Sequence, residues 1–300
     1  MRGSAWYRLP ERSDTFWIQL IAWITLKAGR PMSRLLVYPI TLYFVLTSPK
    51  PPREASNRFF RRVLERAPTF GDHYRQYHTF AVTLVDRLLV LCGQEDCLEL
   101  QLEGLHHLEE ATASGRGCIL VGAHLGSFEI VRALGRLKGG LRVKSIMYGE
   151  ATPAIMGFYR AVNPGLHEDL ITREGPLALM GTDRYLEAGN CVALLGDRVL
   201  PGERHAPVAF LGGEARFPQT AALLSHMFGV PIILFTCLNT GWGRYAIHFD
   251  PLGVPSGSER RQRTAYVKDV LQRYADRLGH YCRQSPYNWF NFHDVWDPEA

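Results

Sequence analysis

The sequence predicts an α/β fold with a mostly parallel central sheet flanked by helices. From residue 98 onward, short apolar runs with β-branched residues, typical of buried strands, alternate with segments of helical periodicity. With 300 residues, 46% of them hydrophobic, the chain can also bury a sizeable core. The expected strands are 98–102, 118–123, 143–148, 191–195, 231–237 and 244–249. The expected helices are 105–114, 127–138, 152–162, 175–188, 218–229 and 257–280.

Two apolar runs, residues 16–26 and 35–46, precede this alternation. At about 1.5 Å per residue, each helix would be shorter than the roughly 30 Å hydrocarbon core of a bilayer. One helix through both runs would place Lys27, Arg30 and Arg34 in the bilayer, which is costly. We therefore expect a helical hairpin or a pair of interfacial helices, and no cleaved signal peptide. Two buried helices of a soluble domain are the alternative.

A proline-rich break at 49–52 divides the chain into an N-terminal membrane-associating helical segment, residues 1–52, and an α/β domain, residues 53–300. Helices are expected at 53–66 and 74–91. From Lys50 to Arg75, seven cations outnumber three acids. Such an excess beside an apolar segment suits a surface that faces anionic lipids. A solvated helix face is the alternative.

Composition and missing motifs exclude several classes of protein. The formal charge of +5 is modest, and no nucleic-acid-binding motif is present. The six cysteines are scattered without a Cys-x-x-Cys pair, which indicates reduced core residues in a cytosolic setting. The eleven histidines show no His-Glu-x-x-His pattern, so we expect no metal and no cofactor. Gly-x-Ser-x-Gly, Gly-x-Gly-x-x-Gly and Gly-Lys-Ser/Thr are also absent, which disfavours a serine hydrolase, a dinucleotide enzyme and a P-loop enzyme.

The segment from His124 to Glu129 joins a base to a carboxylate across a turn that contains glycine. His124 follows the expected strand directly, and Ser127 is placed to cap the expected helix after it. On one continuous helix, side chains five residues apart would diverge by roughly 140°. With His124 in the loop and Glu129 in the first helical turn, the two can meet, and the carboxylate can fix the imidazole tautomer. The alternative is a buried structural histidine beside an ordinary first-turn acid.

This segment resembles the His-x4-Asp/Glu motif of the lysophospholipid acyltransferase superfamily, particularly its bacterial lipid A biosynthesis branch. The resemblance covers about residues 13–296 and is greatest to the acyltransferases found with aryl-polyene biosynthesis systems. It implies an O-acyltransferase in which His124 is the general base and Glu129 orients it. The donor would be an acyl carrier protein or acyl-CoA thioester carrying a fatty or polyene chain, and the acceptor a hydroxyl of a lipid or glycolipid. It also implies attachment to the cytoplasmic face of the cell inner membrane.

Two further segments resemble superfamily blocks. Asp197 and Arg198 end an expected strand, where the family shapes its acceptor site, and an arginine there can bind a phosphate or an oxyanion. Phe217-Pro218 falls where glycerophosphate acyltransferases have Phe-Pro-Glu-Gly-Thr-Arg. The missing Glu, Gly and Arg argue against a simple glycerol-phosphate acceptor, while Arg216 is a candidate contact for an anionic headgroup or a phosphopantetheine. A surface Asp-Arg turn and a surface salt bridge of Arg216 are the alternatives.

Residues 285–296 are unusually aromatic and are expected either to cover an acyl channel, to lie at the lipid interface, or to pack as a C-terminal flap. His293 and Asp294 are adjacent in this segment, and adjacent side chains seldom face each other, so we do not expect them to form a catalytic pair. The competing function for the whole chain is a membrane-bound protein of the same fold that binds lipid or an acyl carrier without turnover.

Overall fold

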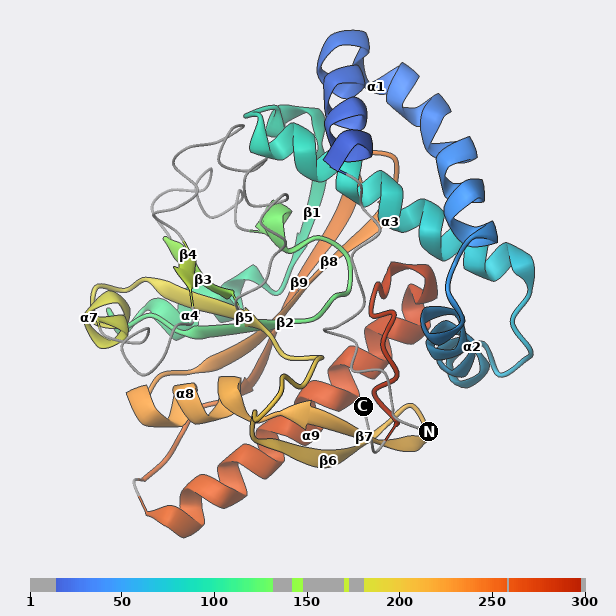
Figure 1. Ribbon diagram of the computed structural model, residues 1–300. Coiled ribbons are helices and arrows are strands. Elements are labelled where there is room, and N and C mark those ends of the chain that lie inside the picture. The colour runs from blue at the N-terminus through green and yellow to red at the C-terminus, as the bar shows by residue number, and fades with distance from the viewer. Residues whose placement is uncertain (1–14, 132–141, 148–169, 173–180, 258, 298–300) are drawn as a thin grey trace.

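The computed structural model describes residues 15–131, 142–147, 170–172, 181–257 and 259–297 (Figure 1). It contains a seven-stranded sheet in the order β1-β9-β8-β2-β5-β3-β4. The strands are β1 (Glu99–Glu103), β2 (Ile119–Gly122), β3 (Val143–Met147), β4 (Leu170–Thr172), β5 (Cys191–Leu195), β8 (Ile232–Gly241) and β9 (Arg244–Gly253). Every pair is parallel except β8 with β9. The expected mixed α/β fold with a mainly parallel sheet is confirmed, and each of the six expected strands is present.

The exception in strand direction follows from chain length. Strands β8 and β9 are longer than expected, and only two residues separate them. A parallel pair needs a crossover of a dozen residues or more, so this pair can only form an antiparallel hairpin. Strand β4 was not expected.

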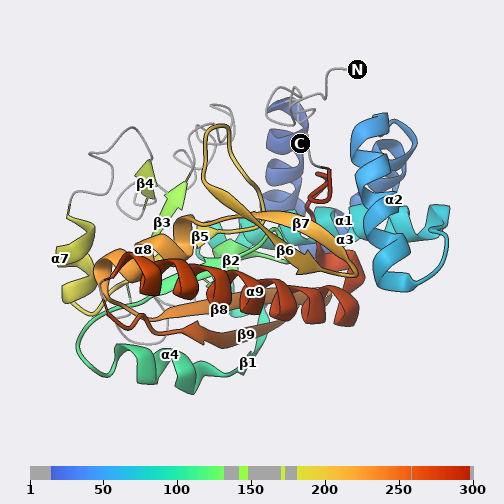
Figure 2. The same ribbon diagram turned by 90° about the horizontal axis from the view of Figure 1, so that it is seen from below.

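Helices cover both faces of the sheet (Figure 2). Helix α4 (Leu105–Thr112) lies on one face, and α9 (Arg260–Gln284) crosses the other with α8 (Thr220–Phe228). Side chains of β2 alternate accordingly: Ile119 and Val121 belong to the core beside α9, and Leu120 to the core on the α4 side. A short helix, α7 (Thr182–Glu187), precedes β5. The helix expected at 152–162 lies outside the described residues, and those at 127–138 and 175–188 lie partly outside them.

A two-stranded hairpin, β6 (His205–Phe210) with β7 (Gly213–Pro218), was missed at the level of sequence. Its turn residues, Leu211 and Gly212, both have positive φ, as tight antiparallel hairpins require. The strands contain Pro207 and end at Pro218, and proline is a poor signal for a strand. The hairpin packs on α9, where Gln272 bonds both the N–H and the C=O of Ala209.

Helix α1 (Thr15–Leu46) is continuous in its assignment, but it contains Pro31 and Pro39 and changes direction along its length (Figure 1). The two apolar runs, expected as a helical hairpin or a pair of interfacial helices, therefore belong to one bent helix. Among the described residues, none of the helices has the length and apolar character that crossing a membrane needs. Membrane association thus stays a prediction.

Helices α2 (Lys50–Leu64) and α3 (Phe70–Leu91) follow. A capping box between Thr69 and Asp72 starts α3. The C-terminal segment, residues 285–297, runs beside α2 and α3 (Figure 1). Gln76 of α3 donates a hydrogen bond to the carbonyl of Trp289 at 2.7 Å. Trp289 is buried against Phe59 of α2, so it packs as part of a C-terminal flap on the core.

Candidate active site

His124 and Asp197 lie just beyond the carboxyl ends of two neighbouring parallel strands. In the register of β2 with β5, Gly122 pairs with Leu195. Each of the two polar residues comes two positions later, so the same register places them opposite each other. Open α/β sheets put their reactive groups at this edge.

Two hydrogen bonds join the pair. The imidazole Nδ1 of His124 lies 2.8 Å from Oδ1 of Asp197, and the His124 backbone N–H donates to Oδ2 at 2.9 Å. Asp197 is fully buried, whereas the His124 side chain is 28% exposed. With its proton on Nδ1, a neutral imidazole keeps an unprotonated Nε2. Within the described residues, Nε2 has no hydrogen-bond partner, so it is the nitrogen available to a substrate proton.

The electrostatics keep His124 neutral and Asp197 ionised. Burial and the charge of Arg198 lower the pKa of His124, against the opposing effect of Asp197 and Glu129. Burial alone would raise the pKa of Asp197, but the interaction with His124 and the charge of Arg198 lower it. At neutral pH the pair is thus an uncharged imidazole beside a carboxylate, which is the state a general base needs.

Glu129 occupies a different position from the one expected. Its carboxylate forms an ion pair with Arg87 of α3. The imidazole nitrogen that we assigned to Glu129 from the spacing is hydrogen-bonded to Asp197 instead, and Glu129 acts on His124 through its charge. The physical reason is the strand register, which brings Asp197 to the ring at bonding distance.

The turn after His124 depends on Gly126. This residue has φ +78°, and a Cβ there would lie 1.7 Å from the carbonyl oxygen of Cys237. The backbone N–H of Gly126 donates to the carbonyl of Asn288, and that of Ser127 donates to Cys237. The helix begins at Phe128, but the buried Oγ of Ser127 has no hydrogen-bond partner in this part of the structure. The expected cap by Ser127 is therefore not formed.

Arg198 is anchored to the C-terminal segment. Its Nε donates to Oδ1 of Asn291 at 3.0 Å, and its Nη2 donates to the carbonyl of Phe290 at 3.3 Å. Asn291 in turn donates to the backbone carbonyl of Asp197. The structure therefore brings Arg198, expected from sequence as an acceptor-site residue, into the same assembly as His124.

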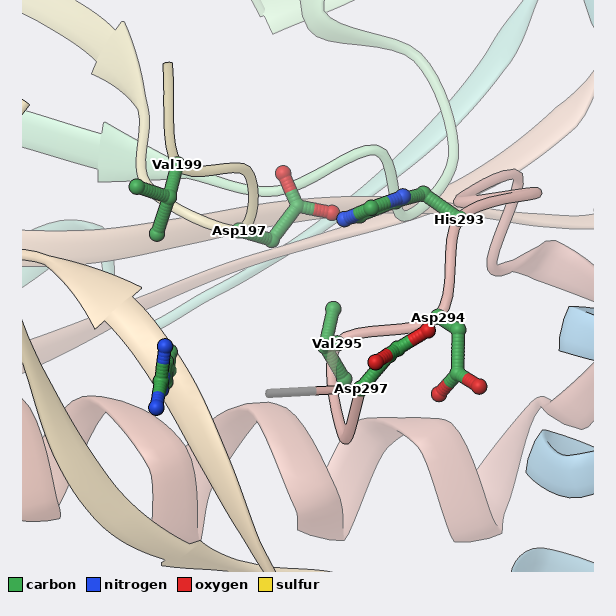
Figure 3. Close-up of a pocket in the computed structure, with 7 residues that line it drawn as sticks. Asp197, Val199, His293, Asp294, Val295 and Asp297 are labelled. Carbon is green, nitrogen blue, oxygen red and sulfur yellow. The ribbon is translucent and has the colours of Figure 1, made fainter. Parts of the chain in front are cut away.

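A small pocket lies beside Asp197 (Figure 3). Its lining includes Arg216, as well as Asp197, Val199, His293, Asp294, Val295 and Asp297. The side chains of Asp197 and His293 are turned toward each other in this pocket (Figure 3). Burial and the charge of Arg198 lower the pKa of His293 to about 4, so its imidazole is neutral at neutral pH. Asp294 forms an ion pair with Arg58 of α2 at 2.6 Å.

The remaining expected site residues, Phe217 and Pro218, end strand β7 and are buried. The ring of Phe217 packs edge-on against Phe210 and Tyr274. Phe217 is therefore a core residue of the hairpin. The neighbouring Arg216 instead lines the pocket.

In the described part of the chain, no group of three or more His, Cys, Asp or Glu side chains is arranged to hold a metal ion. All six cysteines are free. The thiols of Cys118, just before β2, and Cys191, the first residue of β5, lie 3.3 Å apart. Burial raises the pKa of the Cys237 thiol well above its ordinary range.

The sequence pattern of the bacterial lipid A biosynthesis acyltransferase family matches residues 75–297. This range begins in α3 and includes the whole sheet, the pair of His124 and Asp197, and the whole C-terminal segment. No curated protein matches the chain. Because the match covers most of the chain, the protein belongs to this family. Membership supports an acyltransferase that acts on a lipid acceptor.

Proposed function

From that membership, we propose that the protein is an acyl-thioester-dependent O-acyltransferase in which His124 is the general base and Asp197 orients it. The observation that carries this proposal is the hydrogen-bonded pair at the ends of β2 and β5. A buried carboxylate on Nδ1 fixes the tautomer that leaves Nε2 able to accept a proton. Glu129, held by Arg87, supports the imidazolium through its charge at longer range.

The reaction follows from this geometry. Nε2 of His124 takes the proton of the acceptor hydroxyl while the oxygen attacks the thioester carbonyl carbon. A C–O bond forms, and the carbonyl oxygen becomes an oxyanion. As the C–S bond breaks, the proton on the imidazolium passes to the leaving sulfur, which departs as a thiol. Base catalysis of this kind contributes a factor of about 10²–10⁴ to the rate, and no covalent enzyme intermediate is needed.

Donors for the oxyanion are available next to His124. The backbone N–H groups at the start of the helix after Ser127 are one set. The half-buried guanidinium of Arg198, whose charge already acts on His124, is the other. Arg216 lines the pocket beside Asp197 and is the candidate contact for an anionic headgroup or a phosphopantetheine phosphate. Ser127, Phe217 and Pro218 would act on substrate only by shaping the site from behind, because all three are buried.

The donor in this proposal is an acyl carrier protein or acyl-CoA, since both present the acyl chain as a phosphopantetheine thioester. The acceptor is a lipid or glycolipid hydroxyl. The family supports the lipid class of acceptor, and the resemblance to aryl-polyene-associated acyltransferases adds a polyene chain to the fatty chains as a candidate donor group.

We place the protein at the cytoplasmic face of the inner membrane, with α1 and α2 against the lipid. One stripe of α1, Ser33, Val37, Thr41 and Val45, is buried. The opposite side exposes large apolar residues: Met32, Leu35, Tyr38, Leu42, Tyr43 and Leu46. Water is a poor solvent for such a face, whereas a lipid interface suits it. The exposed cations Arg53 and Arg61 of α2 follow directly and match anionic headgroups.

The test is transfer in vitro. Purified protein is incubated with acyl carrier protein or CoA charged with a fatty chain, together with a lipid extract, and the lipids are analysed by mass spectrometry. The wild type is expected to add one acyl chain to a lipid, and His124→Ala to add none while still binding the donor. The exposed His106 supplies the control, because His106→Ala removes an imidazole of α4 and should transfer normally.

Two results would contradict the proposal. Transfer by His124→Ala at the wild-type rate would remove His124 as the base. Donor and lipid binding without transfer by the wild type, with every donor and lipid tried, would favour the non-catalytic binding protein.

A further inference from the structure

Asp197 accepts a hydrogen bond from a residue far away in the chain. The indole Nε1–H of Trp289, in the C-terminal segment, donates to Oδ2 of Asp197 at 3.1 Å. That oxygen also accepts from the backbone N–H of His124, while Oδ1 holds Nδ1 of the ring. Both carboxylate oxygens are therefore occupied, and one of the donors is an indole whose only polar group is this N–H.

We propose that Trp289 is a positioning residue for catalysis, which fixes the Asp197 carboxylate so that Oδ1 faces the imidazole of His124. This inference rests on the proposed function and extends the catalytic assembly to the C-terminal segment. A carboxylate can turn about its last torsion, which is broad and roughly two-fold. A second, rigid donor on Oδ2 opposes that rotation and keeps the pair in the one orientation that fixes the tautomer.

Trp289 is itself held rigidly enough for this role. Its side chain is 1% exposed and packs on Phe59 and Phe210, with ring centroids 4.6 and 5.7 Å away. Its carbonyl accepts from Gln76, and its backbone forms a bridge with Leu125, the residue after His124. The indole therefore moves with the His124 turn and not independently of it.

A neighbouring tryptophan shows what a purely structural indole does here. Trp296 lies in the same segment, 6.1 Å from Trp289 between ring centroids, and stacks on Phe210. Its Nε1 donates to the backbone carbonyl of Phe210, not to Asp197. The two residues are thus a matched pair that differ in the group receiving the indole hydrogen.

The indole hydrogen bond also has an electrostatic consequence. It withdraws negative charge from the carboxylate, so the imidazolium of His124 is stabilised less than by a bare carboxylate. Other charged and titratable groups also face the pair. These groups are Arg198 and Glu129 around His124, and Arg198, His293, Tyr274 and Cys282 around Asp197.

The experiment compares Trp289→Phe with Trp296→Phe, after thermal melting has shown that both are folded. Trp289→Phe is expected to lower kcat about tenfold, the worth of one hydrogen bond to a charged group, with little change in KM. The acid limb of its kcat/KM profile should move to higher pH, because the less neutralised carboxylate raises the pKa of His124. Trp296→Phe should leave both kcat and the acid limb unchanged. Equal kcat and equal acid limbs in the two variants would overturn the proposal.

A second measurement needs neither a folded variant nor activity. In wild-type protein labelled with ¹⁵N-tryptophan, the indole signal of Trp289 is identified by its contact with the ring of Phe59. That signal should shift with pH at the same midpoint as the imidazole signals of His124, and the Trp296 signal should not. An indole signal of Trp289 that ignores the titration of His124 would contradict the positioning role. Absence of acyl transfer by the wild-type protein would instead contradict the proposed function.

Discussion

The site around His124 and the exposed face of α1 differ in how strongly each depends on individual residues. At this site, hydrogen bonds of 3.1 Å or less join Asp197 to His124 and Trp289. Each of these side chains must keep its position for the hydrogen bonds to form. On α1, six large apolar residues share one face, and none of them has a unique contact to make with lipid. Substitution of Asp197 should therefore almost abolish catalysis, whereas a single substitution on α1 should only weaken lipid binding. The predictions below test that contrast.

The largest effect is expected at Asp197. In Asp197→Asn, the two N–H donors on Oδ2 hold the amide oxygen, so the amide NH₂ faces Nδ1 of His124. The imidazole then adopts the wrong tautomer, and kcat should fall by a factor of roughly 10³–10⁴, as in other base–carboxylate pairs. Steady-state kinetics on folded protein measure this. A decrease of less than about tenfold would show that Asp197 does not orient the base.

The next largest effect is expected at Asp72, which links α3 to the C-terminal segment, and it concerns the free energy of unfolding. It accepts hydrogen bonds from Arg66, Thr69 and Tyr287, and Arg66 as the largest contributor lowers its pKa well below the ordinary value of 3.8. Asp72→Asn should lower the free energy of unfolding by about 2 kcal/mol at pH 7, from a lost cap and lost charge-assisted bonds.

Because the pKa of Asp72 is lowered in the folded state, its contribution is present above pH 3.8 and is lost as the pH falls below it. Urea unfolding at pH 7 and near pH 3 should therefore show the gap between wild type and variant shrinking in acid. A gap of the same size at both pH values would contradict this account.

A smaller decrease in kcat is expected from substitution of Glu129. Glu129→Gln removes a charge that acts on His124 from a distance but leaves the Asp197 hydrogen bonds intact, so kcat should fall by about tenfold. Arg87→Gln removes the ion pair with the Glu129 carboxylate. It should change kcat by about tenfold or less. A loss of 10³ or more in Glu129→Gln would return the orienting role to Glu129.

The smallest effect is expected on α1. Leu35 is 65% exposed, and Leu35→Ser should weaken binding to anionic lipid vesicles only about three- to tenfold, as expected for removing one apolar side chain from the interface. Val254→Ser is the control, since Val254 is equally exposed at 68% but follows β9, away from α1 in the sequence. Vesicle sedimentation measures both. Equal affinities for the two variants would remove α1 as the lipid-facing surface.

The same contrast explains what could be predicted from the sequence. Alternating strand and helix patterns are local, and all six expected strands are present. The pairing of His124 with Asp197 depends on β2 lying beside β5, a neighbour relation across 73 residues that no local pattern encodes. The spacing and the resemblance to the His-x4-Asp/Glu motif both point to Glu129, because both rest on residues that are close in sequence. An aromatic segment, in turn, gives no sign of which carbonyl or carboxylate the indole of Trp289 will reach.

The most direct test of the catalytic assignment is the tautomer and titration of His124, measured by ¹⁵N NMR on histidine-labelled wild-type protein. The geometry predicts that Nδ1 carries the proton and Nε2 does not at neutral pH, with a pKa below the ordinary 6.5. Activity should then be lost as the pH falls through that same pKa. A proton on Nε2 of the neutral ring, or a pKa above 6.5, would contradict the role of His124 as a base held by Asp197.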